Sequence, residues 1–282
     1  MANNIRLAQG AARTAARTAV YVLILVWSLV PVLFIVLSSF KRQADIFTFP
    51  PVLAFQPTLD NYATLWRQYD GFFPTLQNSL LVAIGATALA CAASFLAGFV
   101  YSRYSTPALR ASAVYMIAIR LLPPIVVTLP LFPAIDYLGL SDSRTTLIVL
   151  YATFWVSLCT MIMKTFIDEI PRELDEAAMM DGATQAQTLL RVILPLCLQG
   201  MAAGAIFVFI FSWNEFLFAL IFTTQHAKTA PLLISEMMGA IDGTEWGVLF
   251  AGVTIQLLPV ALLVTFAQKH IIVGLTTGAV KG

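Results

Sequence analysis

Six long apolar segments constrain the fold of this chain more than any other feature. Each has about the 20 residues that an α-helix needs to cross roughly 30 Å of hydrocarbon. They lie at roughly 19–40, 76–101, 110–137, 144–164, 197–222 and 247–268. Hydrophobic residues make up 59% of the chain and charged residues only 11%, against about 25% in soluble domains. We therefore predict an all-α membrane protein with six transmembrane helices, in which residues 1–282 form a single transmembrane domain.

The first apolar segment could in principle be a cleaved signal peptide, because Arg6, Arg13 and Arg17 precede it. It is, however, too long for the apolar region of a signal peptide, and no clear small-residue cleavage site follows it. We interpret it as an uncleaved first transmembrane helix that follows a cytoplasmic N-terminus at residues 1–18.

Basic residues predict the orientation, because they concentrate in cytoplasmic loops. If the N-terminus is cytoplasmic, the same side also holds the basic residues Arg6, Arg13, Arg17, Arg103, Arg110, Lys164, Arg172, Arg191, Lys269 and Lys281. The opposite side holds Lys41, Arg42, Arg67, Arg144 and Lys228. The excess of basic residues on the side of the N-terminus predicts that both termini are cytoplasmic. It also places the polar loop 168–195 and the C-terminal tail 269–282 in the cytoplasm.

Two patterns indicate how the helices pack. The third segment contains Pro123, Pro124, Pro130 and Pro133, so we expect it to be kinked or interrupted. It is then either a wall of a pathway or a kink that only packs the bundle. Glycines in the second and fifth segments allow helices to approach closely. They include Gly85, Gly98, Gly200 and Gly204.

The polar loop 168–195 contains the sequence EAAMMDGATQAQTLLRVILP, which indicates two short helices joined by a tight turn. Gly182 suits the left-handed backbone position that ends a helix. Thr184 followed by Gln187 is a capping box that begins the next helix, and Pro195 should end or kink it. The small side chains of Ala177 and Ala178 would let another protein approach the first helix closely.

This loop resembles the EAA loop of ABC importer permeases, in which EAA and a glycine are followed by I-x-LP. The matching residues are Glu176, Ala177, Ala178, Asp181, Gly182, Ala183, Ile193, Leu194 and Pro195. A second proline often follows in that family, where this chain has Gln199. The resemblance implies a type I ABC importer permease fold with a cytoplasmic coupling helix. It also implies that the residues docking on an ATPase are Glu176, Ala177, Ala178, Asp181, Gly182 and Ala183.

The C-terminal sequence GLTTGAVKG resembles the tail of maltose- and trehalose-type carbohydrate permeases. The stretches RLLPP at 120–124 and FSWNEF at 211–216 also resemble this subfamily. By resemblance, the tail residues that contact the ATPase are Thr276, Thr277, Gly278 and Lys281.

The resemblance also implies a set of partners in a bacterial cytoplasmic (inner) membrane. These are a second homologous permease subunit in a heterodimer, two ATP-binding cassette ATPase subunits, an extracytoplasmic solute-binding protein and a carbohydrate substrate. The chain itself has no P-loop, because only Lys164 and Lys228 are followed by Thr and no glycine precedes either. ATP and Mg²⁺ are therefore expected in the partner ATPase, and no cofactor is expected in this chain.

Catalytic and metal-binding patterns are also missing from the sequence. His226 and His270 are the two histidines, and neither belongs to an HExxH motif. Cys91, Cys159 and Cys197 lie in apolar segments without a C-x-x-C spacing, as is typical of small buried hydrophobic residues. The net charge of +1 suggests no nucleic-acid partner, and membrane lipid is the expected surrounding. We expect a non-catalytic subunit without a metal site.

Two charged residues, Arg120 and Glu215, fall inside apolar segments. A charge in mid-membrane costs about 2.5–3.5 kcal/mol on insertion scales, so each should face a partner, a cavity or the bundle interior. The two could form an ion pair that fixes helix packing. Alternatively, Arg120 and Glu215 could line the pathway, with Trp213 and Asn214 offering an aromatic face and an amide to a sugar.

Other classes of function stay open. An ABC importer permease for a non-sugar solute would carry the same EAA loop. A secondary transporter would also be apolar, but it usually has more spans with internal repeats and no reason to keep this loop. An intramembrane enzyme would need a nucleophile and base or a metal cluster at membrane depth, which two peripheral histidines do not supply.

Overall fold

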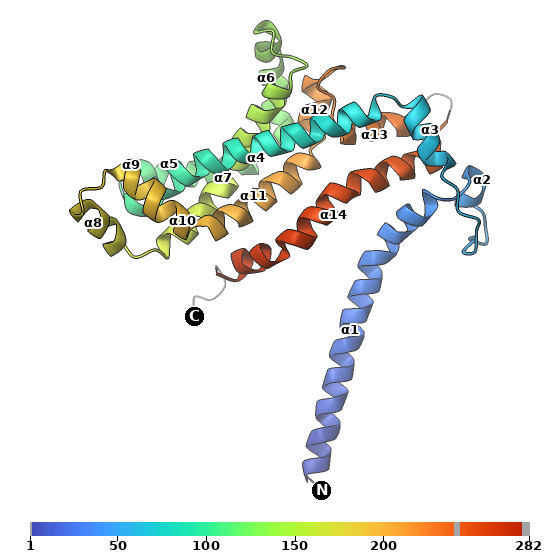
Figure 1. Cartoon of the computed structure of the whole chain (residues 1–282), viewed down its shortest axis with the longest axis horizontal. Helices are drawn as coiled ribbons and strands as arrows, with labels where there is room; N and C mark the ends of the chain where they lie inside the picture. Colours follow the sequence, from blue (N-terminus) through green and yellow to red (C-terminus); the bar gives the residue numbers. More distant parts are fainter. Residues whose placement is uncertain (1, 240–242, 278–282) are drawn as a thin grey trace. The chain divides into compact units, whose positions relative to one another are not determined.

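The computed structural model of the chain describes residues 2–239 and 243–277, with side chains for 13–239 and 243–267. This part of the chain is helical and contains no strand (Figure 1). In order, the helices are α1 (Ala2–Ser38), α2 (Gln43–Ile46), α3 (Asp60–Gln68), α4 (Phe72–Arg103), α5 (Pro107–Ala118), η1 (Ile119–Leu121), α6 (Pro124–Tyr137), α7 (Arg144–Asp168), α8 (Glu173–Met180), α9 (Gln185–Thr188), η2 (Leu189–Ile193), α10 (Leu194–Leu196), α11 (Leu198–Trp213), α12 (Leu217–Phe222), α13 (Ala230–Met238) and α14 (Trp246–Thr277).

The helices fall into two compact units, which are described separately. The first comprises Met1–Asp70 and Met237–Ile255, and the second comprises Gly71–Glu236 and Gln256–Gly282. In the first unit, the side-chain amide of Asn61 donates to the carbonyls of Ser39 and Lys41 and so ties α3 to the end of α1. The single transmembrane domain over residues 1–282 stays a prediction.

Four helical stretches are long and apolar enough to cross a membrane. They are Arg13–Ser38, Phe72–Arg103, Arg144–Asp168 and Trp246–Ala267, and they overlap four of the predicted spans. Two bent pairs meet the same test if each is taken as one span. They are Pro107–Leu121 with Pro124–Tyr137, bent by 95°, and Gln185–Leu196 with Leu198–Trp213, bent by 76°. The described residues thus hold four to six spans, and the count of six stays a prediction.

The third predicted span, 110–137, is interrupted as its prolines suggest. Leu122 has an extended backbone, with ψ 131°, and Pro123 follows with ψ 134° before α6 begins. The proline ring disfavours the helical backbone of the residue before it, so Pro123 and Pro124 set the break. Pro130 and Pro133 lie inside α6 and do not end it.

The fifth predicted span, 197–222, is not one helix, and the sequence analysis did not foresee this. α11 ends at Trp213 and α12 begins at Leu217. The side-chain amide of Asn214 donates to the Ile210 carbonyl, and the Glu215 carboxylate accepts from the backbone N–H of Phe218. The Glu215 carboxylate thus satisfies an N–H group at the start of α12 that would otherwise be free in an apolar surrounding. The Asn214 side chain adds a second donor to the Ile210 carbonyl, which also accepts from the Asn214 backbone N–H.

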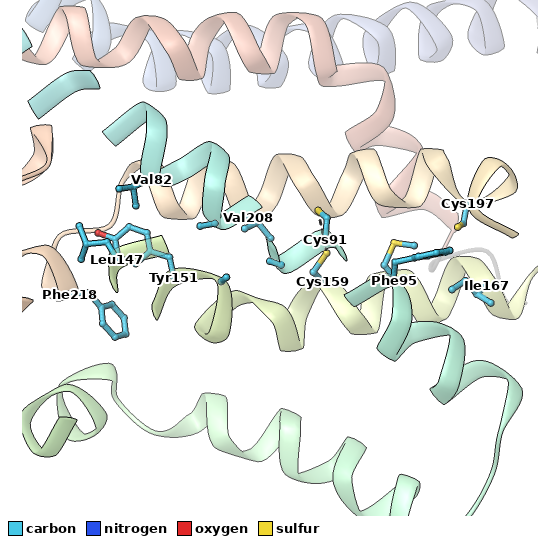
Figure 2. Close-up of a cluster of buried hydrophobic side chains, with 14 of the residues drawn as sticks. Val82, Cys91, Phe95, Leu147, Tyr151, Cys159, Ile167, Cys197, Val208 and Phe218 are labelled. Atoms are coloured by element: carbon cyan, nitrogen blue, oxygen red, sulfur yellow. Dashed lines mark hydrogen bonds between the residues drawn. The ribbon is translucent and has the colours of Figure 1, made fainter. Parts of the chain in front are cut away.

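The core of the second unit lies where α4, α7 and α11 pack against one another (Figure 1). Figure 2 shows part of it, with Val82 and Phe95 from α4, Tyr151 and Ile167 from α7 and Val208 from α11. Cys91, Cys159 and Cys197 are free and buried in this core, as the sequence predicts for small hydrophobic residues.

Glycines set the spacing between these helices. A Cβ atom on Gly98 of α4 would lie 2.8 Å from the Met163 Cβ and 3.0 Å from the Lys164 backbone nitrogen of α7. A Cβ on Gly200 of α11 would lie 2.3 Å from the Phe166 Cγ. The prediction that glycines permit close helix contact is therefore confirmed at these two positions.

Asp142, in the loop between α6 and α7, holds the segment that follows α12. Its carboxylate accepts from the backbone N–H groups of Thr224 at 3.1 Å, Gln225 at 3.1 Å, His226 at 2.9 Å and Ala227 at 2.9 Å. The Asp142 backbone has φ 54°, a left-handed conformation that Asp tolerates better than most residues. Burial alone would raise the Asp142 pKa, but the four N–H groups together hold it below its usual value.

The opposite side of the same segment is tied to α4. The Asn78 amide donates to the carbonyls of His226 at 2.8 Å and Lys228 at 2.9 Å. The Ser79 hydroxyl accepts from the Ala230 N–H at 2.8 Å, where α13 begins. The N–H groups and the carbonyls of this short segment are thus held by different parts of the chain.

We expect Gly98→Val to destabilise the protein, because the new side chain meets backbone atoms of α7 that cannot move aside. Overpacking of this kind costs about 1–3 kcal/mol. Thermal unfolding of the detergent-purified protein measures the effect. Gly71→Ala is the matched control, since nothing lies within 4 Å of a Cβ atom there. Equal midpoints for Gly98→Val and the wild type would contradict the close approach of α4 and α7.

We expect Asp142→Asn to lower the thermal midpoint at neutral pH, because the amide loses the charge that the four N–H groups stabilise. Folding lowers the pKa of Asp142. Such a group stabilises the folded state at pH values above its pKa in the unfolded chain, and this stabilisation is lost as the pH falls through its pKa in the folded state. The difference between wild type and variant should therefore shrink in strong acid. Asp136→Asn, which removes a carboxylate that accepts from the Ser141 hydroxyl, is the control. A difference that is independent of pH would contradict the role of the charge.

Candidate functional site

The first half of the polar loop forms α8 and a glycine turn. Gly182 has φ 86°, as the sequence predicts for the residue after the end of this helix. Its N–H donates to the Met179 carbonyl, and the Ala183 N–H donates to the Ala178 carbonyl, both at 3.0 Å. These bonds satisfy carbonyls at the C-terminus of α8 that have no partner within the helix.

The second half begins with the predicted capping box. The Thr184 hydroxyl accepts from the Gln187 N–H at 3.3 Å, and the Gln187 side chain accepts from the Thr184 N–H at 2.8 Å. The helix then widens into the π-helical turn η2 before α10, and the chain bends around Cys197. Pro195 has no N–H to give to the helix, which fits both the wider turn and the bend two residues later.

The residues expected to dock on an ATPase lie on the free side of this loop. Glu176, Ala177, Asp181 and Gly182 are exposed, and Ala178 and Ala183 are half-buried. The Met180 side chain beside them is 88% exposed. The structure thus leaves all six of these residues accessible, while their docking role stays a prediction.

The opposite side of α8 is held by an ion pair. The Arg103 Nε at the end of α4 lies 2.6 Å from the Asp175 Oδ2, and the two side chains are only 8% and 12% exposed. Arg103 also donates to the Ile167 carbonyl at 3.2 Å and to the Ile170 carbonyl at 3.1 Å. One guanidinium therefore joins the ends of α4 and α7 to α8. Removing one partner of a buried ion pair costs about 3–5 kcal/mol.

Two further hydrogen bonds connect the loop with the end of α4. The Arg172 Nη2 donates to the Ser102 carbonyl at 3.0 Å, and the Gln185 Nε2 donates to the Tyr104 hydroxyl at 2.5 Å. Apolar packing contributes little, because Asp175 is the one buried residue of α8.

Asp175 is not among the site residues predicted from the sequence, and Arg103 was predicted only as a basic residue on the cytoplasmic side. A usable signal was present. Arg103 follows an apolar span directly, and Asp175 directly precedes Glu176 in a loop on the same predicted side of the membrane. Opposite charges at neighbouring helix ends on one side are candidates for a pair, but the sequence does not say which of several acids is used.

The C-terminal candidates are only partly described. α14 continues to Thr277, beyond the end expected for the sixth span at 268, so Thr276 and Thr277 belong to the helix. Gly278 and Lys281 lie outside the described residues. Contact of this tail with an ATPase stays a prediction.

Arg120 does not pair with Glu215. The ion pairs among residues with described side chains are Arg103–Asp175, Lys164–Asp168 and Lys228–Glu236. The interpretation of an Arg120–Glu215 pair that fixes helix packing is therefore wrong. Each charge instead has its own neutral partners.

Arg120 lies on η1, beside the bend between α5 and α6. Its guanidinium carbon is 5.0 Å from the ring centroid of Trp155 and 5.8 Å from that of Phe154. Its Nη1 donates to the Ser157 hydroxyl at 3.4 Å. Aromatic faces can stabilise a cation in an apolar surrounding, so the charge is held without a carboxylate.

A cavity of about 240 Å³ lies next to Arg120. Its lining includes Arg120, Leu131, Thr153, Phe154, Ser157 and Phe218. The lining is largely apolar, with a guanidinium and two hydroxyl groups from Thr153 and Ser157.

The residues Trp213, Asn214 and Glu215 do not converge on one site. Trp213 is 1% exposed, and its indole N–H donates to the Gln256 carbonyl at 3.2 Å. It therefore offers no free face to a sugar in this conformation. Asn214 is exposed, and the Glu215 carboxylate caps α12 through the N–H groups of Phe218 and Ala219.

The chain was compared with known proteins. The family model described as "Binding-protein-dependent transport system inner membrane component" matches residues 90–275. The sulfoquinovosyl glycerol transport system permease protein of Agrobacterium fabrum is 34% identical over 263 residues, which cover 92% of this chain and 91% of that protein. The trehalose/maltose transport system permease protein of Thermococcus litoralis is 32% identical over 263 residues, which cover 93% of this chain and 94% of that protein.

A solved structure shows the same fold. It is the crystal structure of a bacterial ABC transporter involved in the import of the acidic polysaccharide alginate, with a TM-score of 0.76 at 18% identity. The match covers 90% of this chain and 94% of that one. The EAA-like loop, the helical architecture and the family match agree. The chain belongs to the binding-protein-dependent transport system inner membrane component family, the membrane-embedded permease subunits of ABC importers.

Proposed function

We propose that this chain forms half of the translocation pathway of an ATP-driven importer for a sugar, a polyol or a sugar derivative. The observation that carries the proposal is the geometry of α8. This helix presents Glu176, Ala177 and Asp181 to the outside of the chain while Asp175 ties its other side to the membrane helices. A helix that is anchored on one side and bare on the other is suited to receive a force from a second protein.

ATP and Mg²⁺ belong, in this proposal, to two ATP-binding cassette subunits on the cytoplasmic side. The proposal also places both termini and the loop 168–195 in the cytoplasm. A second homologous permease completes the pathway, most simply as a heterodimer, and a solute-binding protein delivers the solute from outside. The description of the family names a binding protein, which supports the last of these partners.

The proposed cycle assigns mechanical and polar roles to this chain and no bond chemistry. Closure of the ATPase dimer moves α8, and the membrane helices turn the pathway outward to accept the solute. Hydrolysis reverses the movement. Arg120, Ser157 and Thr153 are the polar groups of this chain placed to touch a solute during passage, because they line the cavity beside the α5–α6 bend.

The first test is a pull-down of the tagged chain from its native membrane in a gentle detergent, with the captured proteins identified by mass spectrometry. We expect a P-loop ATPase and a second permease with an EAA-type loop. Capture of the chain alone, under conditions that preserve another ABC importer of the same cells, would overturn the proposal.

Uptake by cells with and without the gene then tests the solute class. Radiolabelled trehalose and maltose are the first probes, because these sugars are named for the relative from Thermococcus litoralis. If cells without the gene still take up both sugars but no longer take up an amino acid or a phosphate ester, the chain would belong to an importer of another solute. Uptake that follows a proton or sodium gradient without an ATPase would indicate a secondary transporter.

We expect Gly182→Val to abolish ATP-driven uptake. The position has φ 86°, where a side chain with a branched Cβ strains the backbone by about 1–2 kcal/mol or more. Nothing lies within 4 Å of a Cβ atom there, so the effect would come from the backbone and not from a clash. Gly182→Asn is the control, since Asn tolerates left-handed backbone. Equal loss in both variants would contradict the conformational explanation.

We expect Glu176→Lys to reduce both uptake and the amount of ATPase captured, because it reverses a charge on the exposed side of α8. Glu169→Lys is the matched control, since it makes the same change at an exposed residue before α8. Western blotting of the membrane fraction checks that each variant is present. Normal ATPase capture with Glu176→Lys, or equal loss with Glu169→Lys, would remove this side of α8 as the docking surface.

A further inference from the structure

We infer that Arg103 is a positioning residue that makes α8 move together with α7, so that a force on α8 reaches the cavity beside Arg120. The inference rests on the proposed function and adds the route by which the force travels. Arg103 is not part of the EAA motif and lies on a different element, at the end of α4.

The first support is that the Arg103 side chain donates hydrogen bonds to several elements at once. Its guanidinium donates to Asp175 of α8 and to the carbonyls of Ile167 and Ile170 at the end of α7. A planar guanidinium with five N–H donors can hold such acceptors at once, which the point charge of a lysine cannot do in the same geometry. The three helix ends thus share one rigid group.

The second support is that little else attaches α8 to α4 and α7. Asp175 is its one buried residue. A cavity of about 180 Å³ lies on one side, lined in part by Phe99 and Met179, and one of about 330 Å³ lies on another, lined in part by Phe166 and Leu174. Without the ion pair, α8 would be held to α4 and α7 chiefly by the Arg172–Ser102 hydrogen bond and the flanking chain.

The third support is that α7 connects the Arg103 contacts with the cavity beside Arg120. The same helix that ends beside Arg103 also provides Thr153, Phe154 and Ser157 to the cavity beside Arg120. A displacement of the α7 end is therefore a displacement of one wall of this cavity. Because helices are stiff along their axis, no further intermediate is needed.

The test uses the complex captured with its ATPase, reconstituted in lipid nanodiscs, with Thr153→Cys as a reporter in the cavity. Thr153 is exposed, whereas the native cysteines are buried, so the parent without the reporter measures the background. The rate of labelling by N-ethylmaleimide is measured with and without AMP-PNP and Mg²⁺. Binding of a fluorescent ATP analogue checks that the ATPase sites stay occupied.

Three variants are compared on this reporter. Arg103→Gln removes the whole clamp, and Asp175→Asn removes only the charged partner on α8 while Arg103 keeps its bonds to α7. Lys164→Gln is the matched control, because it breaks the exposed Lys164–Asp168 ion pair on the same helix. The double variant Arg103→Gln/Asp175→Asn tests whether the two residues act as one unit.

We expect AMP-PNP to change the labelling rate several-fold in the wild type and with Lys164→Gln. With Arg103→Gln or Asp175→Asn the rate should no longer respond, although nucleotide still binds, and the double variant should be no worse than either single one. A full response with Asp175→Asn would overturn the inference and leave the proposed function standing. Loss of the ATPase from the Asp175→Asn complex would overturn it too, since the pair would then serve docking. No response in the wild type would overturn the proposed function itself, and this inference with it.

Discussion

The close approach of α4 and α7 is the contact on which the rest of the second unit depends. At Gly98 the two backbones come so near that a methyl group would not fit. Five residues later, the same spacing lets the Arg103 side chain reach the carbonyls of Ile167 in α7 and of Ile170 just after it, and still bind Asp175. A wider separation would leave the guanidinium short of one of its partners. The packing of α4 against α7 thus determines where α8 is held.

Breaks in the membrane helices coincide with polar side chains that would otherwise be costly there. At the α11–α12 break, the Glu215 carboxylate accepts from the backbone N–H of Phe218, and the Asn214 side chain adds a hydrogen bond to the Ile210 carbonyl. Arg120 lies beside the 95° bend that Pro123 and Pro124 produce, with aromatic rings under its guanidinium. Hydrocarbon penalises a free backbone group and a lone charge alike, so placing the two together lets each offset the other. Such sites are also where a bundle can change shape at low cost.

Local chemistry explains what the sequence could and could not predict. The turn at Gly182, the capping box of Thr184 and Gln187 and the break at Pro123 follow from backbone rules that act over a few residues, and each is confirmed. The break at Asn214 was missed although its hydrogen bonds are local, because the largely apolar segment 197–222 was taken as one continuous helix. The Arg103–Asp175 pair was missed because it depends on which distant groups the fold brings close. The prediction of an Arg120–Glu215 pair was wrong. Two charges in apolar segments need partners, but the sequence alone does not exclude aromatic rings and helix ends as those partners. The structure gives the exposure of the residues expected to dock on an ATPase, and their docking role stays a prediction.

The Asp142 loop has a consequence for exchanging parts between related permeases. The segment 223–230 is held through its N–H groups by Asp142 and through its carbonyls by Asn78, and these two residues come from regions far from it in the chain. A chimera that takes only the segment 223–230 from another permease would place a foreign backbone between the Asp142 and Asn78 side chains, whose positions match the original one. The transferable module is therefore discontinuous: the loop before α7, the start of α4 and the stretch up to α13 would have to be exchanged together.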